Sequence, residues 1–366
     1  MWPVGTAWAV WPATFLFGAP LLLLTFSSRV KLPRWALGVM ALHGYLAASI
    51  AWSADPEYGW TIFGMTLYTP ALLCLAIQVR PLPRLLLLLL AVAGVVFALV
   101  GLVSGENGSR LSAFGGGPIV FARVVAMSLL VFVYYYARTG KWLLLLPIPL
   151  LVMVEVLSGS RGPWLSTAIA GGSLIVMLYT RISSPRQKIA CLGVAGLLGL
   201  ALATGWAPDT VYGRVTRATI NEHYDTGRLT MTKWAWEGFL KHPLIGMGLG
   251  GYSSITQVIP SRYGAQYSDK PTYPHNLLLD VAATGGVVGL GLLAGTLVLY
   301  WRALRSRRMT PLSYLFASLG ILQAVGSMTS GTFYDARWIW LFMLLVMVTT
   351  EQKTLPAPSG GHSITA

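Results

Sequence analysis

The chain has 366 residues, of which 55% are hydrophobic and only 10% are charged. Soluble domains usually carry about 25% charged residues, so this composition excludes an ordinary soluble protein and indicates a protein that crosses a membrane several times. Its 26 lysines and arginines against 12 aspartates and glutamates give a net charge of +14, an excess that in a soluble chain would suggest nucleic acid.

Eleven stretches of the chain are long and apolar enough to cross a bilayer, which takes about 20 helical residues. They lie at residues 7–26, 35–52, 60–79, 85–104, 118–137, 142–158, 163–180, 189–207, 275–301, 311–330 and 337–350. The sequence therefore predicts an all-α polytopic integral membrane protein with about eleven transmembrane helices. We divide it into eight helices over residues 1–207, a long outer-face segment over 208–274, three helices over 275–350 and a tail over 351–366.

Basic residues fall in every second gap between these stretches. They are Arg29, Lys31, Arg34, Arg80, Arg84, Arg138, Lys141, Arg181, Arg186, Lys188, Arg302, Arg305, Arg307, Arg308 and Lys353. By the positive-inside rule these gaps are cytoplasmic, which predicts an outer N-terminus and a cytoplasmic C-terminus. With one acid, Glu351, these gaps account for the whole net charge of +14. The excess is an insertion signal that leaves no basic patch, so we expect no nucleic-acid partner. The uncharged start does not read as a cleaved signal peptide.

The outer segment 208–274 is the longest polar stretch, and segments of that length are usually functional. Residues 225–242 are predicted to form an amphipathic helix, because Leu229, Trp236 and Leu240 recur at helical spacing and Pro243 ends the pattern. The glycine-rich run 246–251 follows. Its backbone N–H groups could approach an anion, and a tight turn or close helix packing explains it equally well.

Three ionisable residues fall inside the apolar stretches, where burying a charge is costly and indicates function: Arg123, Glu155 and Asp280. Each lies within about one and a half turns of the outer end of its helix, taking 3.6 residues per turn. They predict a polar crevice that opens to the outer face. Arg123 and Glu155 could also simply pair with each other between two helices.

Two further kinds of residue at the outer face carry chemistry, a histidine and several arginines. His275 stands at the expected outer N-terminus of the ninth helix, which disfavours the cationic imidazole and leaves a neutral general base, although a helix-capping role is also open. Arginines at the same face could hold a phosphate or pyrophosphate through their forked donors: Arg110, Arg161 and Arg228, and also Arg214, Arg217, Arg262 and Arg337. Asn276 and Asp280 are candidates for orienting His275, since they follow it on one helix.

Several other kinds of active site are excluded by missing motifs. The chain has no Asp-x-Asp pair, no P-loop and no His-Glu-x-x-His helix, so we expect neither a metal site nor a bound cofactor. Cys74 and Cys191 both lie in apolar runs and indicate no disulfide framework.

Four blocks of this sequence resemble motifs of the O-antigen ligase and polymerase superfamily of bacterial envelope glycosyltransferases. They are Arg110-Leu-Ser-Ala-Phe-Gly, Ser160-Arg161-Gly162, the run from Arg228 to Trp236 that continues to the glycines after His242-Pro243, and His275-Asn276 placed nine residues before Gly286-Val-Val-Gly289. Arg161-x-x-x-Leu165 also matches the arginine motif of the ligases. The resemblance spans roughly residues 35 to 350.

The resemblance implies a metal-independent, inverting glycosyl transfer at the outer face of the bacterial inner membrane. The donor would be a glycan linked to undecaprenyl pyrophosphate, and the acceptor a hydroxyl of lipid A-core in a ligase or of a second lipid-linked glycan in a polymerase. In this scheme His275 takes the proton of the acceptor hydroxyl, while Arg161, Arg228 and Arg110 stabilise the departing pyrophosphate.

The sequence departs from the family pattern at Ile119, where an asparagine is common, and at Thr284, where a glutamate is common. It also has eleven expected spans where the family usually has twelve. The ligase is our main interpretation and the polymerase is the alternative. A lipid-linked glycan transporter would predict internal repeats and broken helices near the membrane centre, and we find neither pattern in the sequence.

Overall fold

A computed structural model describes residues 32–67, 69–70, 73, 83–104, 111–115, 117–204, 228–255, 258–261, 264–267 and 273–352. Helices dominate this part of the chain, and six of them are long and apolar enough to cross a membrane. The prediction of an all-α polytopic membrane protein is therefore confirmed. The expected number of eleven spans is not tested in full, because the span at 7–26 and part of that at 60–79 lie outside the described residues.

The main helices are α2 Arg34–Ala48, α3 Pro56–Thr66, α5 Pro83–Ser104, α6 Gly117–Thr139, α7 Pro147–Leu157, α8 Arg161–Tyr179, α9 Pro185–Thr204, α11 Arg228–Lys241, α12 Leu277–Arg305, α13 Pro311–Ser330 and α14 Arg337–Thr349. Short 3-10 helices cover Ser49–Trp52, Trp142–Leu145, Gly251–Ile255 and Phe333–Asp335. Strand β1 Val258–Ser261 pairs antiparallel with β2 Gly264–Tyr267, and β3 Arg307–Arg308 pairs antiparallel with β4 Glu351–Gln352. The hairpin of β1 and β2 lies in the outer segment 208–274, for which we predicted one amphipathic helix and no strand.

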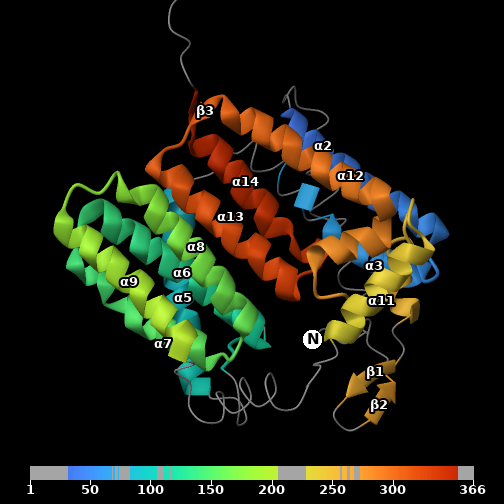
Figure 1. Ribbon diagram of the computed structural model, residues 1–366, viewed down its shortest axis with the longest axis horizontal. Helices are drawn as coiled ribbons and strands as arrows, with labels where there is room; N and C mark the ends of the chain where they lie inside the picture. The colour runs from blue at the N-terminus through green and yellow to red at the C-terminus, as the bar shows by residue number, and fades with distance from the viewer. Residues whose placement is uncertain are drawn as a thin grey trace, which may run out of the picture.

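Helix α14 joins two halves of the helix bundle (Figure 1). Helices α5 to α9 lie together in one half, α2, α3, α11 and α12 lie in the other, and α13 and α14 run between them. Successive turns of α14 present Phe342 and Val346 to the first half, and Trp340 and Leu344 to the second. Since a helix repeats every 3.6 residues, one apolar helix can pack against both halves of the bundle at once.

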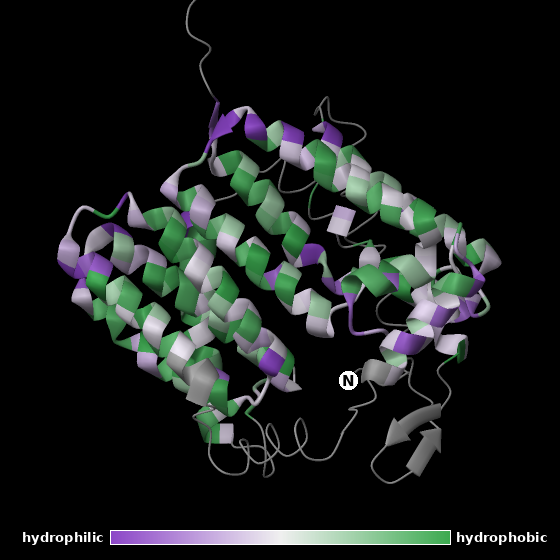
Figure 2. Cartoon of the chain, viewed as in Figure 1, coloured by the Kyte–Doolittle hydropathy of each residue, from purple (hydrophilic) through white to green (hydrophobic). Residues whose placement is uncertain are grey.

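The outside of the bundle is apolar where a membrane would surround it (Figure 2). Exposed aliphatic side chains follow the length of α5: Leu85, Leu88, Leu89, Val92, Val96, Leu99, Leu102 and Val103. A soluble protein rarely exposes a continuous apolar surface of this size. This face of α5 is therefore suited to contact with lipid.

The predicted amphipathic helix 225–242 is present as α11 Arg228–Lys241. Met231 and Ala235 are buried, whereas Trp236 and Leu240 are exposed. Ala235 packs near Ala283 of α12 and Tyr252. Trp236 and Leu240 thus face away from the bundle, as a helix at the lipid headgroups would place them.

Helix α12 is broken at Gly286, which the sequence analysis did not anticipate. Gly286 has φ +62° and ψ −158°, a conformation that is essentially restricted to glycine. The glycine-rich segment 243–248 fills the break with its own backbone. Met247 and Gly248 donate to the carbonyls of Ala283 and Thr284, at 2.8 and 3.0 Å.

The second half of α12 is capped by the same segment. The N–H groups of Val287 and Val288 donate to the carbonyls of Pro243 and Leu244, at 2.8 and 3.2 Å. The Tyr45 hydroxyl bonds to the carbonyls of Ile245 and Gly285, both at 3.0 Å. Because Met247 and Gly248 donate to carbonyls, they are not available to an anion. The structure therefore supports the close-packing interpretation of these glycines, and the break is closed by protein.

Candidate functional site

Five helix ends meet at one end of the bundle. The N-termini of α6, α8, α12 and α14 lie there together with the C-terminus of α13 (Figure 1). This is the end that the charge pattern of the sequence predicts to face outward. The opposite end carries β3 and β4, which join the basic connection after α12 to the residues after α14.

The C-terminal turn of α13 connects the predicted site residues. Asn276, next to His275, donates from Nδ2 to the carbonyl of Met328 at 3.0 Å. Gly162, next to Arg161, lies so close to Thr329 that a Cβ there would collide with its side chain. Since Met328 and Thr329 are consecutive, the structure brings His275 and Arg161 to the same helix turn.

Arg123 reaches the same turn with its side chain. Its Nη2 donates to the carbonyl of Gly326 at 2.8 Å and to the hydroxyl of Ser330 at 2.9 Å. Glu155 instead accepts a hydrogen bond from the Thr167 hydroxyl at 2.6 Å on α8. The interpretation of Arg123 and Glu155 as a pair is therefore wrong. Arg123 is hydrogen-bonded to α13 instead, and Glu155 to α8.

Small residues at the end of α13 make this convergence possible, and the sequence analysis missed them. The run Gly326-Ser-Met-Thr-Ser-Gly331 ends an apolar stretch. Small residues let helices approach closely, and their hydroxyls and carbonyls can bond across helices. The run of small residues at the outer end of this span could have indicated that other helices pack closely there.

His275 holds an unusual backbone conformation. Its φ is +57°, a left-handed value that non-glycine residues rarely adopt. Its ring lies over that of Tyr273, with centroids 4.2 Å apart and planes at 47°. Strained residues of this kind cluster at active sites, where the surrounding structure holds them. The conformation therefore supports a functional role for His275.

Asn276 stabilises this conformation from the next position. It is the N-cap of α12, and its Oδ1 accepts a hydrogen bond from the backbone N–H of Leu279 at 3.1 Å. Both ends of its amide are thus bonded to the backbone, one to α12 and one to α13. Any orienting effect of Asn276 on His275 passes through the main chain.

We predict that Asn276→Ala lowers the free energy of unfolding by about 1–2 kcal/mol, because it removes an N-cap and an interhelix hydrogen bond. It should also reduce activity by displacing His275. Asn276→Asp should keep the cap and retain more of the stability. Thermal unfolding in detergent measures the first effect.

Thr310 provides the matched control at the opposite end of the bundle. It caps α13 and bonds to the carbonyl of Thr349 at 2.8 Å. Thr310→Ala should cost similar stability and leave activity intact. Equal losses of activity in the two variants would contradict a special role for Asn276.

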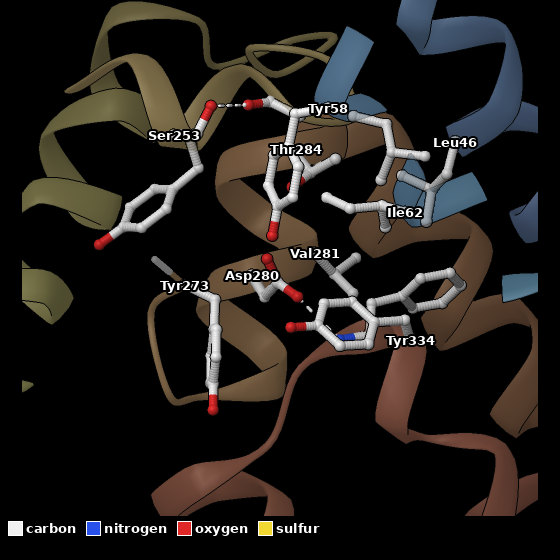
Figure 3. A pocket seen from close by; sticks show the side chains of 13 residues that line it. Leu46, Tyr58, Ile62, Ser253, Tyr273, Asp280, Val281, Thr284 and Tyr334 are labelled. Atoms are coloured by element: carbon white, nitrogen blue, oxygen red, sulfur yellow. Dashed lines mark hydrogen bonds between the residues drawn. The ribbon is translucent and has the colours of Figure 1, made fainter. Parts of the chain in front are cut away.

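Asp280 lies one turn into α12, in a pocket on the side of α2 and α3 (Figure 3). Its Oδ2 accepts a hydrogen bond from the backbone N–H of Phe333 at 2.8 Å. Four tyrosines line the same pocket: Tyr58, Tyr252, Tyr273 and Tyr334. We call this space the tyrosine pocket. Asp280 therefore anchors the connection between α13 and α14 and presents its carboxylate to the pocket.

Asp335 is a further acid at this end. Burial raises the pKa of its carboxyl, while the nearby charges of Arg337 and Arg123 act in the opposite direction. Its backbone N–H bonds to the Thr332 hydroxyl at 3.3 Å. Asp335 thus lies within electrostatic range of Arg123 and also of Asp280.

The other predicted residues are placed only in part. Arg161 begins α8 and is exposed. Arg228 begins α11, and its side chain lies outside the described part of the structure. Arg110 lies outside the described residues altogether. Among the residues that are described, no three His, Cys, Asp or Glu side chains are grouped as metal ligands would be.

Comparison with known proteins gives two matches. Residues 146–294 match a protein family described as O-Antigen ligase, and this range contains Arg161, Arg228, His275, Asn276 and Asp280. The chain is also 24% identical over 350 residues to a Pseudomonas aeruginosa protein named O-antigen ligase, which covers 90% of this chain and 81% of that protein.

Proposed function

Because the chain belongs to the O-antigen ligase superfamily of membrane glycosyltransferases, we propose that it transfers a glycan from undecaprenyl pyrophosphate to a hydroxyl of lipid A-core. The reaction would take place at the outer face of the bacterial inner membrane, without a metal. The observation that carries this proposal is the C-terminal turn of α13, which contacts Arg123 and the neighbours of both His275 and Arg161.

The proposed reaction is a substitution at the anomeric carbon of the donor sugar. The acceptor oxygen forms the new bond to this carbon, and its proton moves to the imidazole of His275. The bond from the anomeric carbon to the pyrophosphate oxygen breaks, and undecaprenyl pyrophosphate leaves with the electron pair. Attack opposite the leaving group inverts the anomeric configuration.

Positive charge on the leaving-group side supports this reaction. Arg161 and Arg228 would hold the departing pyrophosphate together with Arg110, through charge-assisted hydrogen bonds. Preorganised donors of this kind stabilise charge that develops in the transition state. Arg123 is partly buried and already bonded to α13, so its charge acts on the site at a distance.

The test is transfer by purified protein from a defined undecaprenyl-pyrophosphate oligosaccharide in the presence of EDTA. Lipid A-core and a second donor molecule are offered separately. We expect product on lipid A-core at a rate that EDTA does not change. Chain growth on the second donor would instead identify a polymerase. Absence of both products, together with donor translocation in proteoliposomes, would contradict the proposal in favour of a transporter.

A further inference from the structure

We propose that Glu155, a buried acid in α7, is a positioning residue for the arginines that would hold the departing pyrophosphate. The inference rests on the proposed function, because it gives this side chain a role in glycosyl transfer without contact to a substrate. Glu155 is 3% exposed and lies two residues before the end of an apolar helix. A carboxyl inside a membrane span is costly to bury, and its presence there indicates a function.

The carboxyl of Glu155 has apolar surroundings and one polar contact. Within the described part of the chain, its hydrogen-bond partner is the Thr167 hydroxyl of α8, at 2.6 Å. The other side chains that line the cavity beside it are mostly apolar, including Val152, Val156, Ala168 and Leu198. Thr167 also lies 2.9 Å from the carbonyl of Pro163, to which it can donate instead. An apolar residue in place of Glu155 would therefore leave no donor unsatisfied, and stability alone does not explain the glutamate.

The backbone of Glu155 binds the turn that carries Arg161. Its carbonyl accepts from the Ser158 hydroxyl and from the indole Nε1 of Trp164, both at 2.6 Å. The Ser158 hydroxyl in turn accepts from the backbone N–H of Ser160 at 3.2 Å. Since Ser158 precedes Arg161 in the chain and Trp164 follows it, the last turn of α7 holds both sides of this arginine.

The same end of α7 contacts the segment that follows Arg110. The N–H of Leu111 donates to the carbonyl of Leu157 at 3.3 Å. Leu157 is the last residue of α7 and lies in the same helical turn as Glu155. The end of α7 therefore brings the neighbour of Arg110 to the turn with Arg161, although the two arginines are far apart in the chain.

The carboxyl of Glu155 links two helices that otherwise have different neighbours. Helix α7 packs mainly against α6, whereas α8 packs mainly against α13, where Gly162 lies against Thr329. The hydrogen bond from Thr167 to Glu155 fixes the start of α8 relative to α7, and with it the position of Arg161. Donors stabilise the charge of a transition state only when the surrounding residues hold them in place.

Two substitutions of Glu155 separate this role from a purely structural one. Glu155→Leu removes the acceptor, and Glu155→Gln keeps an oxygen that can accept from Thr167. We expect Glu155→Leu to unfold at the wild-type temperature or above it, and to bind undecaprenyl pyrophosphate about tenfold more weakly. Glu155→Gln should bind it as the wild type does. Thermal unfolding and calorimetric titration of the detergent-solubilised protein measure these effects.

Hydrogen exchange provides a readout that needs no substrate. The backbone amides of residues 158–164 should exchange faster in Glu155→Leu than in the wild type, because the start of α8 has lost its link to α7. Thr167→Val removes the other partner of the hydrogen bond and should have the same effect. Combining it with Glu155→Leu should add no further loss of affinity, since both changes remove one interaction.

Ser128→Ala is the matched control. Ser128 is as fully buried as Glu155, and its hydroxyl donates to the carbonyl of Ala91 at 2.9 Å, which links α6 to α5. Its removal deletes an interhelix hydrogen bond that does not reach the turn with Arg161. This variant should keep the wild-type affinity and the wild-type exchange of residues 158–164.

Either wild-type affinity or wild-type exchange of residues 158–164 in Glu155→Leu would overturn the inference. A loss of affinity in Glu155→Gln as large as that in Glu155→Leu would also overturn it, because the hydrogen bond would then not be the cause. The proposed function fails separately, if the wild-type protein binds no undecaprenyl pyrophosphate. In that case faster exchange in Glu155→Leu would still show that Glu155 positions the turn with Arg161.

Discussion

His275→Asn is expected to reduce glycosyl transfer by about 100-fold to 10,000-fold, the usual contribution of a general base. Asparagine tolerates the left-handed backbone that His275 adopts, with φ +57°. The substitution therefore removes the proton acceptor while keeping the local fold. Initial rates of transfer from the lipid-linked donor measure the effect.

The same variant should retain binding and stability. Its thermal unfolding temperature and its affinity for undecaprenyl pyrophosphate should match those of the wild type, because the arginines are untouched. His275→Ala provides a second variant in which the left-handed conformation is less favourable. Wild-type rates in the asparagine variant would show that another group accepts the proton.

Gly286→Ala is expected to lower the free energy of unfolding by more than about 3 kcal/mol. Its backbone, at φ +62° and ψ −158°, disfavours any residue with a Cβ. A Cβ at this position would also run into the carbonyl of Leu244 and the nitrogen of Gly246. The inserted segment 243–248 would have to leave the break in α12, with the loss of its hydrogen bonds to both halves. Thermal unfolding and limited proteolysis of that segment measure this.

Gly291→Ala is the control for this substitution. Gly291 lies in the same helix, and a Cβ there would meet nothing within 4 Å. Alanine in a helix interior is favoured over glycine by roughly 1 kcal/mol, so this variant should be as stable as the wild type or more stable. If the two variants unfold alike, the break at Gly286 is not a determinant of the fold.

Several elements followed directly from the sequence. The spans expected at 311–330 and 337–350 appear as α13 Pro311–Ser330 and α14 Arg337–Thr349. Residues next to each helix set where it begins. Pro311 starts α13 directly after the capping Thr310, and the charged Arg337 stands at the start of α14. Apolar length, prolines and charges act within a few residues, and sequence analysis reads them well.

Only part of the candidate site could be predicted from the sequence. His275, Asn276 and Asp280 are close in sequence, so their common place at the start of α12 could be predicted. The tyrosine pocket could not, because Tyr58, Tyr252 and Tyr334 come from three distant segments. The hydrogen bonds from Arg123 to Gly326 and Ser330 could not be predicted either, because they depend on which helix lies beside α6.

The sequence by itself determined that this protein crosses a membrane, which end of each span carries positive charge, and which family its motifs resemble. These properties depend on local hydrophobicity, charge and short motifs. Only the tertiary structure decided that α12 breaks at Gly286, that residues 243–248 complete it, and that α13 ends beside Arg123 and the neighbours of Arg161 and His275. The reason is that a backbone group without a partner in its own helix must find one elsewhere, and helix packing decides which distant residue supplies it.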